Sequence, residues 1–333
     1  MKKYILKRLL LIIPTFFGIT LITYSMVRFA PGDYTMLKGG IDGAMKEGAI
    51  SSEYLAQERA LYGLDKPIII GYADWLFKFV QLDFGTSRKD NKPVVERISE
   101  TLPVTITLSV ITIIIIYIIS IPMGVISAVK KDTLFDRGQA LVLFILYSLP
   151  SFWVGLLLLV YLAGGEYLNL FPLGGITSDF MENVGFFTRL ADVMWHLVLP
   201  VITLTYGGFA FLSRYARANM LEVINQQYIT TARAKGLSEK RVIFVHAFRN
   251  SLVPLVTLMA SLLPGLIGGS VIVESIFSIP GIGRLGFEAI LSRDIPVIMA
   301  ITSMSALLTL IGILLADIMY AVVDPRIRLE GKA

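Results

Sequence analysis

Six long apolar stretches divide this sequence, and they constrain its fold more than any other feature. A helix that crosses a hydrocarbon core of about 30 Å needs ~20 consecutive, mainly apolar residues. Six stretches meet this requirement, at residues 9–29, 102–129, 140–163, 193–212, 252–273 and 296–323. Only 17% of the residues are charged, whereas soluble domains have about 25%. The sequence therefore predicts an all-α membrane protein with six transmembrane helices.

The positions of Lys and Arg between these stretches predict the orientation of the chain. Basic residues gather in alternate connections, namely Lys2, Lys3, Lys7, Arg8, Lys130, Lys131, Arg137, Arg326, Arg328, Lys332 and seven more within residues 214–250. The other connections, at about 30–101, 164–192 and 274–295, are neutral to acidic. Because basic connections stay on the cytoplasmic side of a membrane, we expect both termini and residues 214–250 to be cytoplasmic.

The apolar stretches also suggest three parts of the chain. Residues 1–29 are the N-terminal tip and first transmembrane helix, and residues 102–333 form a five-helix core that includes the loop 214–250. Residues 30–101 are too polar to lie in a membrane and too poor in apolar residues to fold alone. We expect them to form an extracytoplasmic cap, with helical pieces at 52–61 and about 68–82.

The polar loop at residues 214–250 is the main candidate for a functional site. It contains seven Lys and Arg and two Glu, and each basic residue at membrane depth would cost about 2.5–3.5 kcal/mol. Strong helix formers precede Gly236, and Ser238 can cap a second helix. Three apolar residues are then available for burial, namely Ile229, Leu237 and Val242. Topology alone explains the charge, but the internal turn favours a folded projection that docks on a partner.

Residues that could carry catalysis are few. The chain has no Cys, and its two His, His196 and His246, are far apart, which disfavours a histidine metal site. The glycines of 281–286 follow no strand and have no Walker lysine, so they are interpreted as turn glycines. Asp132 and Asp136 flank a short loop and are interpreted as ordinary solvated charges. The sequence predicts no catalytic, metal or cofactor site, and the chain is not expected to be an enzyme.

Ionisable residues within the apolar stretches are also few. A proton-coupled secondary carrier needs carboxylates or His near the middle of several spans, but Arg28 and Asp317 lie near span ends and Glu274 just beyond the fifth stretch. A stand-alone carrier or channel and a membrane enzyme or insertase are the two alternatives, and both need residues inside the bilayer that are not seen. If the chain belongs to a pump, its energy comes from a partner.

Several motifs carry a resemblance to a known family. The principal motif comprises Tyr228, Ile229, Thr230, Thr231, Ala232, Arg233, Ala234, Lys235, Gly236 and Leu237, and a second part follows at 246–254. Further motifs lie at 28–33, 82–87, 273–283 and 324–328. Together they resemble permease subunits of ATP-binding-cassette importers of the oligopeptide, dipeptide and nickel branch. The wider superfamily has Glu and Ala where Thr230 and Thr231 stand, a departure usual for the peptide branch.

The resemblance implies a type I importer permease fold in a bacterial cytoplasmic membrane. It also implies four kinds of partner: a second homologous permease, two ATPase subunits, an extracytoplasmic solute-binding protein and a peptide substrate. The segment Tyr228–Leu237 would couple to the ATPase subunits, which bind ATP and Mg²⁺ in place of this chain. Import of oligosaccharides or nickel by the same architecture is an alternative, and the residues of the substrate path are not assigned.

Overall fold

A computed structural model describes residues 2–29, 66–165, 167–179, 181, 184–262 and 265–323. The predicted helix at 52–61 and the basic C-terminal tail lie outside these residues. Within them the regular structure is helical, apart from one isolated β-bridge between Thr86 and Pro93. This agrees with the predicted all-α class. The chain divides into two compact units, each described by itself below.

The helices of the described residues are α1 (Lys2–Phe29), α3 (Ile68–Val80), α4 (Val94–Val129), α5 (Leu134–Ser148), α6 (Ser151–Leu162), α7 (Phe186–Ile224), α8 (Gln227–Ala234), α9 (Glu239–Arg241), the π-helix η2 (Val242–Ala247), α10 (Phe248–Ser261), α11 (Gly265–Gly268), α12 (Val271–Ile276), α13 (Ile282–Leu291) and α14 (Ile295–Val323).

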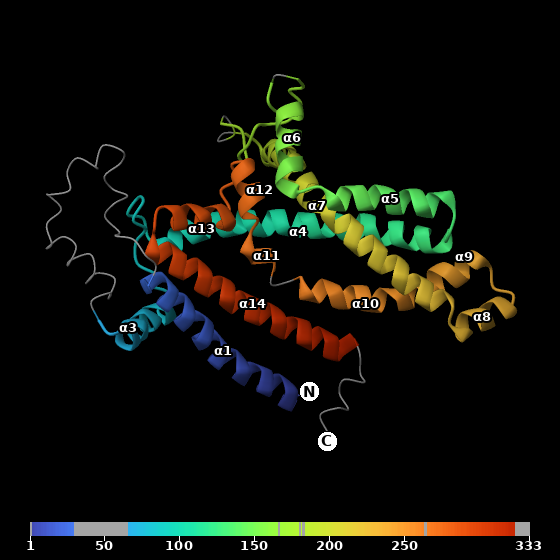
Figure 1. The fold of residues 1–333 in the computed structure, drawn as a ribbon, viewed down its shortest axis with the longest axis horizontal. Coiled ribbons are helices and arrows are strands. Elements are labelled where there is room, and N and C mark those ends of the chain that lie inside the picture. The colour runs from blue at the N-terminus through green and yellow to red at the C-terminus, as the bar shows by residue number, and fades with distance from the viewer. Residues whose placement is uncertain are drawn as a thin grey trace. The chain divides into compact units, whose positions relative to one another are not determined.

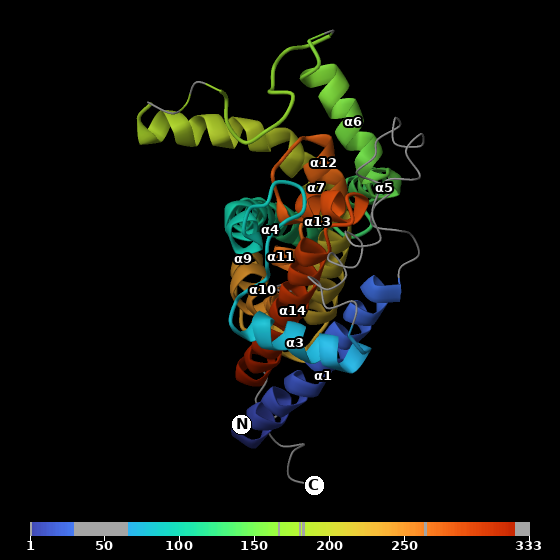
Figure 2. The same ribbon diagram turned by 90° about the vertical axis from the view of Figure 1, so that its left-hand side faces the viewer.

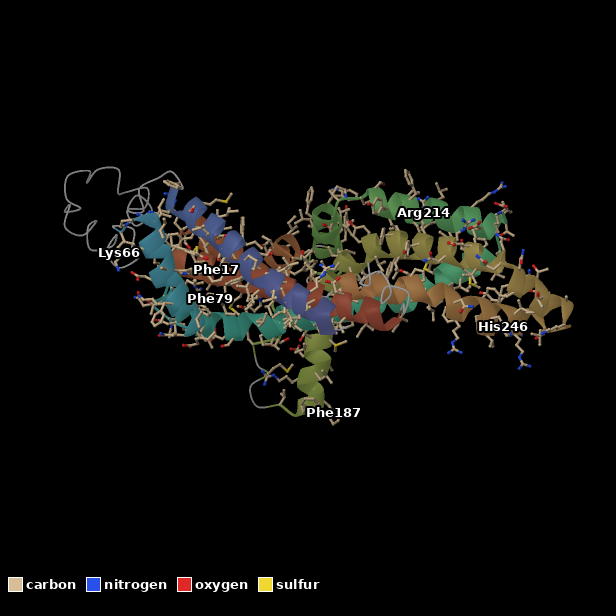
Figure 3. The ribbon with its side chains drawn as sticks, turned by 90° about the horizontal axis from the view of Figure 1, so that it is seen from below. Phe17, Lys66, Phe79, Phe187, Arg214 and His246 are labelled. Atoms are coloured by element: carbon tan, nitrogen blue, oxygen red, sulfur yellow. The ribbon has the colours of Figure 1, made fainter. Side chains whose placement is uncertain are left out.

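The N-terminal unit comprises residues 2–102 and 285–311. In it α3, close to the predicted helix at 68–82, packs on α1 through aromatic residues. The hydroxyls of Thr20 and Tyr72 lie 2.8 Å apart, and the rings of Phe16 and Phe79 are centred 5.5 Å apart. Figure 3 labels Phe17 and Phe79 on these neighbouring helices. Helix α3, which lies within the predicted cap region, is therefore held to the first helix.

The core unit consists mainly of residues 103–284 and 312–333. The α4–α5 hairpin lies along α7 (Figure 1), and α5, α6 and α10 all contact α7. A side chain at Gly124 of α4 would place its Cβ 2.4 Å from the Ser213 carbonyl oxygen of α7. The glycine therefore lets two backbones approach closely, as small residues do between membrane helices. An apolar cluster that includes Leu108 of α4, Leu199 of α7 and Phe277 at the end of α12 packs these helices together.

Four helices of the described residues are long and apolar enough to cross a membrane. They are α1, α4, α7 and α14, and a fifth span is possible if α5 and α6 act together. This differs from the predicted six continuous spans at the third and fifth stretches. The predicted third span bends by 92° between α5 and α6 (Figure 2). Pro150 follows Leu149 at this bend, and proline disfavours helical backbone in the preceding residue.

The predicted fifth span, residues 252–273, is divided among α10, α11 and α12. Helix α10 ends at Ser261, and α11 is only four residues long. Gly269 then adopts φ +63°, in the left-handed region that no continuous α-helix uses. Glycine-rich sequence therefore breaks this apolar stretch, and such breaks are tolerated in membranes where neighbouring protein covers the backbone.

Candidate functional site

The predicted helix, turn and second helix are present between α7 and α10. We call residues 225–250 the elbow: α8 ends at Ala234, Gly236 turns the chain, and α9 leads into η2 at the far end of α7 (Figure 1). Gly236 has φ +79°, and its N–H donates a hydrogen bond of 2.9 Å to the Arg233 carbonyl. Because this backbone region favours glycine, Gly236 fixes the direction in which the chain leaves α8.

The inner face of the elbow packs on its own chain. Its fully buried or nearly buried apolar residues are Ile229, Ala232, Val242 and Ala247. They share one apolar cluster with Val125 and Ala128 of α4 and Met220 of α7, with Leu237 partly buried against it. Of the three residues predicted for burial, Ile229 and Val242 are fully buried and Leu237 is partly buried, and all three pack in the cluster with α4 and α7. The elbow is a fixed extension of these two helices.

The outer face of the elbow is exposed and carries most of the polar residues of the principal motif, together with exposed Phe244 and Val245. Of the ten residues of the principal motif, those exposed are Tyr228, Thr230, Thr231, Arg233, Ala234, Lys235 and Gly236. Figure 3 shows side chains with nitrogen tips projecting from the part of the chain around His246. The motif is therefore divided between residues that attach the elbow and residues that present a basic surface.

Two side-chain contacts join the halves of the elbow. Arg233 Nε donates to Glu239 Oε1 over 2.7 Å, and Asn250 Nδ2 donates to the Tyr228 hydroxyl over 2.7 Å. An exposed ion pair such as the first contributes only about 0–1 kcal/mol of stability. These contacts therefore act mainly on the orientation of α8 relative to α9 and α10. Ser238 occupies the predicted N-cap position, but its side chain makes no capping hydrogen bond, and most of the second helix is π-helix η2.

Asp136 is not the solvated charge that the sequence suggested. It lies in the first turn of α5 and is only 5% exposed. Arg217 of α7 holds it with two hydrogen bonds, Nε to Oδ1 at 2.8 Å and Nη2 to Oδ2 at 2.7 Å. Asp132, in contrast, is exposed as expected. The pattern Thr133-x-x-Asp136 is a capping sequence and could have signalled an ordered carboxylate, but not its partner 81 residues away.

Glu274 is a second buried carboxylate whose surroundings the sequence did not indicate. It lies in α12 and is 0% exposed. Thr105 Oγ1 of α4 donates to its Oε1 over 3.0 Å, and the Arg284 N–H donates to its Oε2 over 2.8 Å. The same Thr105 oxygen accepts the Ile282 N–H at 2.8 Å. Glu274 and Thr105 together thus join α4, α12 and the start of α13 by hydrogen bonds.

Three glycines surround the Glu274 carboxylate. A Cβ at Gly281 would lie 2.4 Å from its Cδ, and one at Gly283 would lie 2.9 Å from its Oε2. A Cβ at Gly269 would lie 2.7 Å from Oε1. The glycines at 281 and 283, interpreted from sequence as turn residues, therefore also leave room for a carboxylate. Larger side chains at these positions would collide with it.

A third polar cluster holds the loop after α3 within the N-terminal unit. Asp294 is 1% exposed and accepts hydrogen bonds from Ser87 Oγ at 2.5 Å and the Arg88 N–H at 2.9 Å. Nearby Asp90 accepts the Lys92 N–H and lies 3.6 Å from Arg97 Nε. Partial burial acts to raise the pKa of Asp90, but this hydrogen bond and the Arg97 charge outweigh it and lower the pKa. The motif at 82–87 is thus held in place by the hydrogen bond between Ser87 and Asp294.

The described residues contain no candidate metal-binding site. No group of three or more His, Cys, Asp or Glu residues there is placed to hold a metal ion. His196 is buried, and its Nδ1 lies 2.8 Å from the Asp192 carbonyl oxygen, which suits a structural role for this histidine.

Comparison with known proteins shows that the chain is similar to permease proteins of transport systems. Residues 120–329 match the family described as "binding-protein-dependent transport system inner membrane component". The chain is 42% identical to the oligopeptide transport system permease protein AppB of Bacillus subtilis, over 98% of this chain and 99% of AppB. It is 38% identical to the dipeptide transport system permease protein DppB of Escherichia coli, with the same two coverages.

A solved structure supports the fold. A chain of the MetNI methionine ABC transporter, in an inward-facing conformation, matches with a TM-score of 0.50 and 15% identity. The match covers 69% of this chain and 97% of that chain. It supports the type I importer permease fold, and with the apolar helices above it identifies a multi-pass membrane protein.

Proposed function

Because the chain belongs to the family of binding-protein-dependent transport system inner membrane components, we propose that it is a permease subunit of an ATP-driven importer of oligopeptides or dipeptides. It forms half of the translocation pathway, and a second, homologous permease forms the other half. The names of two relatives, an oligopeptide and a dipeptide permease, support the peptide class.

The elbow is the observation that carries this proposal. Its apolar inner face is packed on α4 and α7, while seven residues of the principal motif are exposed. A surface held this firmly can transmit a displacement to the helices beneath it, as a slack loop cannot. In our proposal the exposed residues of Tyr228–Leu237 dock on one of two ATPase subunits. Those subunits bind and hydrolyse ATP with Mg²⁺, and this chain has no catalytic role or cofactor.

The proposal also includes the orientation of the chain in the membrane and a solute-binding protein as a partner. The charge distribution supports cytoplasmic termini and a cytoplasmic elbow. The opposite side then faces an extracytoplasmic solute-binding protein, which delivers the peptide. Alternating access follows if closure of the ATPase pair moves the two elbows together and opens the pathway to the outside.

Uptake in proteoliposomes tests this function. The complete complex, with the binding protein on the opposite side from the elbow, is expected to accumulate labelled peptide only when ATP is present on the elbow side. ATPase subunits with their phosphate-binding lysine replaced are the matched control. Unlabelled peptides should compete, whereas oligosaccharides and nickel should not. Preferential uptake of either of those would overturn the peptide assignment, and uptake that survives ATP depletion under an ion gradient would identify a secondary carrier.

A further inference from the structure

The pair of buried Asp136 and partly buried Arg217 lies where three helices of the core unit meet. Besides the two hydrogen bonds from Arg217 of α7, the Asp136 carboxylate accepts the Asp132 N–H at 3.0 Å and the hydroxyl of Ser127 at the end of α4. Its four donors thus come from α4, the α4–α5 turn and α7. The carboxylate ties together the ends of helices that are far apart in sequence.

The same helices approach each other closely on the adjacent turn. A Cβ at Gly124 of α4 would lie 2.7 Å from the Ala216 Cβ and 2.9 Å from the Arg217 nitrogen of α7. Only the single hydrogen of a glycine fits between these backbones. Asp136 of α5 is bonded to α7 through Arg217 and to α4 through Ser127. Sliding of α4 along α7 would therefore break either the hydrogen bond from Ser127 or those from Arg217.

The elbow is attached to the same two helices. Its buried residues Ile229 and Val242 pack on Val125 of α4 and Met220 of α7. Val125 precedes Ser127 by two residues, and Met220 follows Arg217 by three, less than one helical turn. A displacement of the elbow consequently reaches the ends of α4 and α7 within one turn of the ion pair.

The type of interaction is informative. A buried ion pair is weak evidence for a role in stability, because well-packed apolar residues of similar volume often serve as well or better. A two-point contact between a guanidinium and a carboxylate specifies one geometry, which apolar contacts do not. An element that must move as one body needs such a fixed geometry.

We propose that Asp136 and Arg217 are positioning residues for energy coupling: their ion pair holds the ends of α4, α5 and α7 as one rigid block that moves with the elbow. This rests on the proposed function, since it assumes that an ATPase subunit drives the elbow. Without the pair, the joined ends of α4 and α5 slip against α7, and part of the displacement of the elbow is lost before it reaches the spans.

The coupling ratio, peptide molecules imported per ATP hydrolysed, tests this role in the complete reconstituted complex. Asp136→Asn and Arg217→Gln are expected to lower this ratio at least fivefold while ATP hydrolysis continues. Matched controls are Asp132→Asn, in the same turn, and Arg214→Gln, one helical turn away, because both residues are exposed. Neither control should change the ratio. Equal ratios in Asp136→Asn and Asp132→Asn would overturn the proposal.

A distance measurement separates slippage from simple loss of structure. The chain has no natural Cys, so spin labels can be placed at exposed Thr231 of α8 and exposed Leu141 of α5. In the complete complex their distance distribution should stay narrow and unchanged between the nucleotide-free and ATP-trapped states. It should broaden or shift on trapping in Asp136→Asn. A distribution that shifts equally in both proteins would contradict a rigid block.

Failure of this inference differs from failure of the proposed function. If the unsubstituted complex shows no ATP-dependent uptake, the proposed function fails. If it imports peptide and Asp136→Asn keeps its coupling ratio, only the role of the ion pair fails. Should Asp136→Asn not assemble, Arg217→Lys keeps the charge but loses the two-point contact, and the same two outcomes apply to it.

Discussion

Replacement of Glu274 by alanine is expected to cause the largest loss of stability among single substitutions in the core unit. The carboxylate accepts hydrogen bonds from the Thr105 hydroxyl and the Arg284 N–H, and also from the Ser270 N–H at 3.3 Å. Each buried donor left without a partner costs about 1–3 kcal/mol. A total loss of at least ~3 kcal/mol follows, and α12 loses its hydrogen bond to α4.

The thermal midpoint of the purified protein, followed as the fraction that stays monodisperse in detergent, measures this effect. Glu274→Ala should lower the midpoint strongly, and Glu274→Gln less, because the amide keeps one acceptor. Glu222→Gln, at an exposed position of α7, is the control and should leave the midpoint unchanged. A midpoint for Glu274→Ala equal to that of this control would contradict the role of the carboxylate.

A double substitution sharpens the test. Gly281→Ala alone is expected to be strongly destabilising, because its methyl group would lie 2.4 Å from the Glu274 Cδ. Glu274→Ala removes that carbon, so the combined substitution should cost clearly less than the sum of the two single losses, as residues in contact do in double-mutant cycles. Strict additivity would mean that Gly281 serves only as a turn residue.

Gly236→Pro is expected to abolish ATP-coupled transport while the membrane-spanning helices remain folded. Proline requires φ near −65°, whereas residue 236 adopts φ +79° and donates its N–H to the Arg233 carbonyl. The exit from α8 would therefore change direction and displace the exposed surface. Gly236→Asn is the matched control, because asparagine tolerates this backbone region better than other residues. Peptide uptake and retention of the ATPase subunits during purification are the measurements.

Arg233 offers a complementary test on the same surface. Arg233→Glu places two negative charges together, because Glu239 lies 2.7 Å from the natural guanidinium. Uptake should fall at least tenfold. Adding Glu239→Arg restores an internal ion pair with reversed charges: recovery would mean that only the shape of the elbow matters, whereas continued loss would mean that Arg233 contacts the ATPase directly. Normal uptake in both Gly236→Pro and Arg233→Glu would refute the docking role.

Local sequence patterns predicted the parts of this fold that depend on local physics. The apolar lengths of α1, α4, α7 and α14 reflect the thickness of a membrane, and the turn at Gly236 reflects a backbone conformation that favours glycine. The buried carboxylates could not be found in the same way. Asp136 and Glu274 bind side chains 81 and 169 residues away, and in sequence each is an ordinary acidic residue near the end of an apolar stretch.

The interruptions of the third and fifth apolar stretches were missed for a related reason. Hydropathy averaged over ~20 residues is insensitive to one proline or a pair of glycines. The bend before Pro150 and the break at Gly269 depend on backbone geometry and on the neighbouring helices that satisfy the freed backbone groups. The polar surroundings of Glu274, close behind the second break, belong to that same three-dimensional arrangement.

Cross-linking from single cysteines in the elbow tests the central claim most directly, because the natural chain contains no Cys. Thr231 and Lys235 are exposed, whereas Ala232, between them, is 8% exposed and serves as the control. With a short cross-linker in the assembled complex, cysteines at 231 and 235 should join to an ATPase subunit, with a yield that changes between nucleotide-free and ATP-trapped states. Cysteine at 232 should not. Absence of any cross-link from 231 and 235 in a complex that still imports peptide would contradict coupling through the elbow.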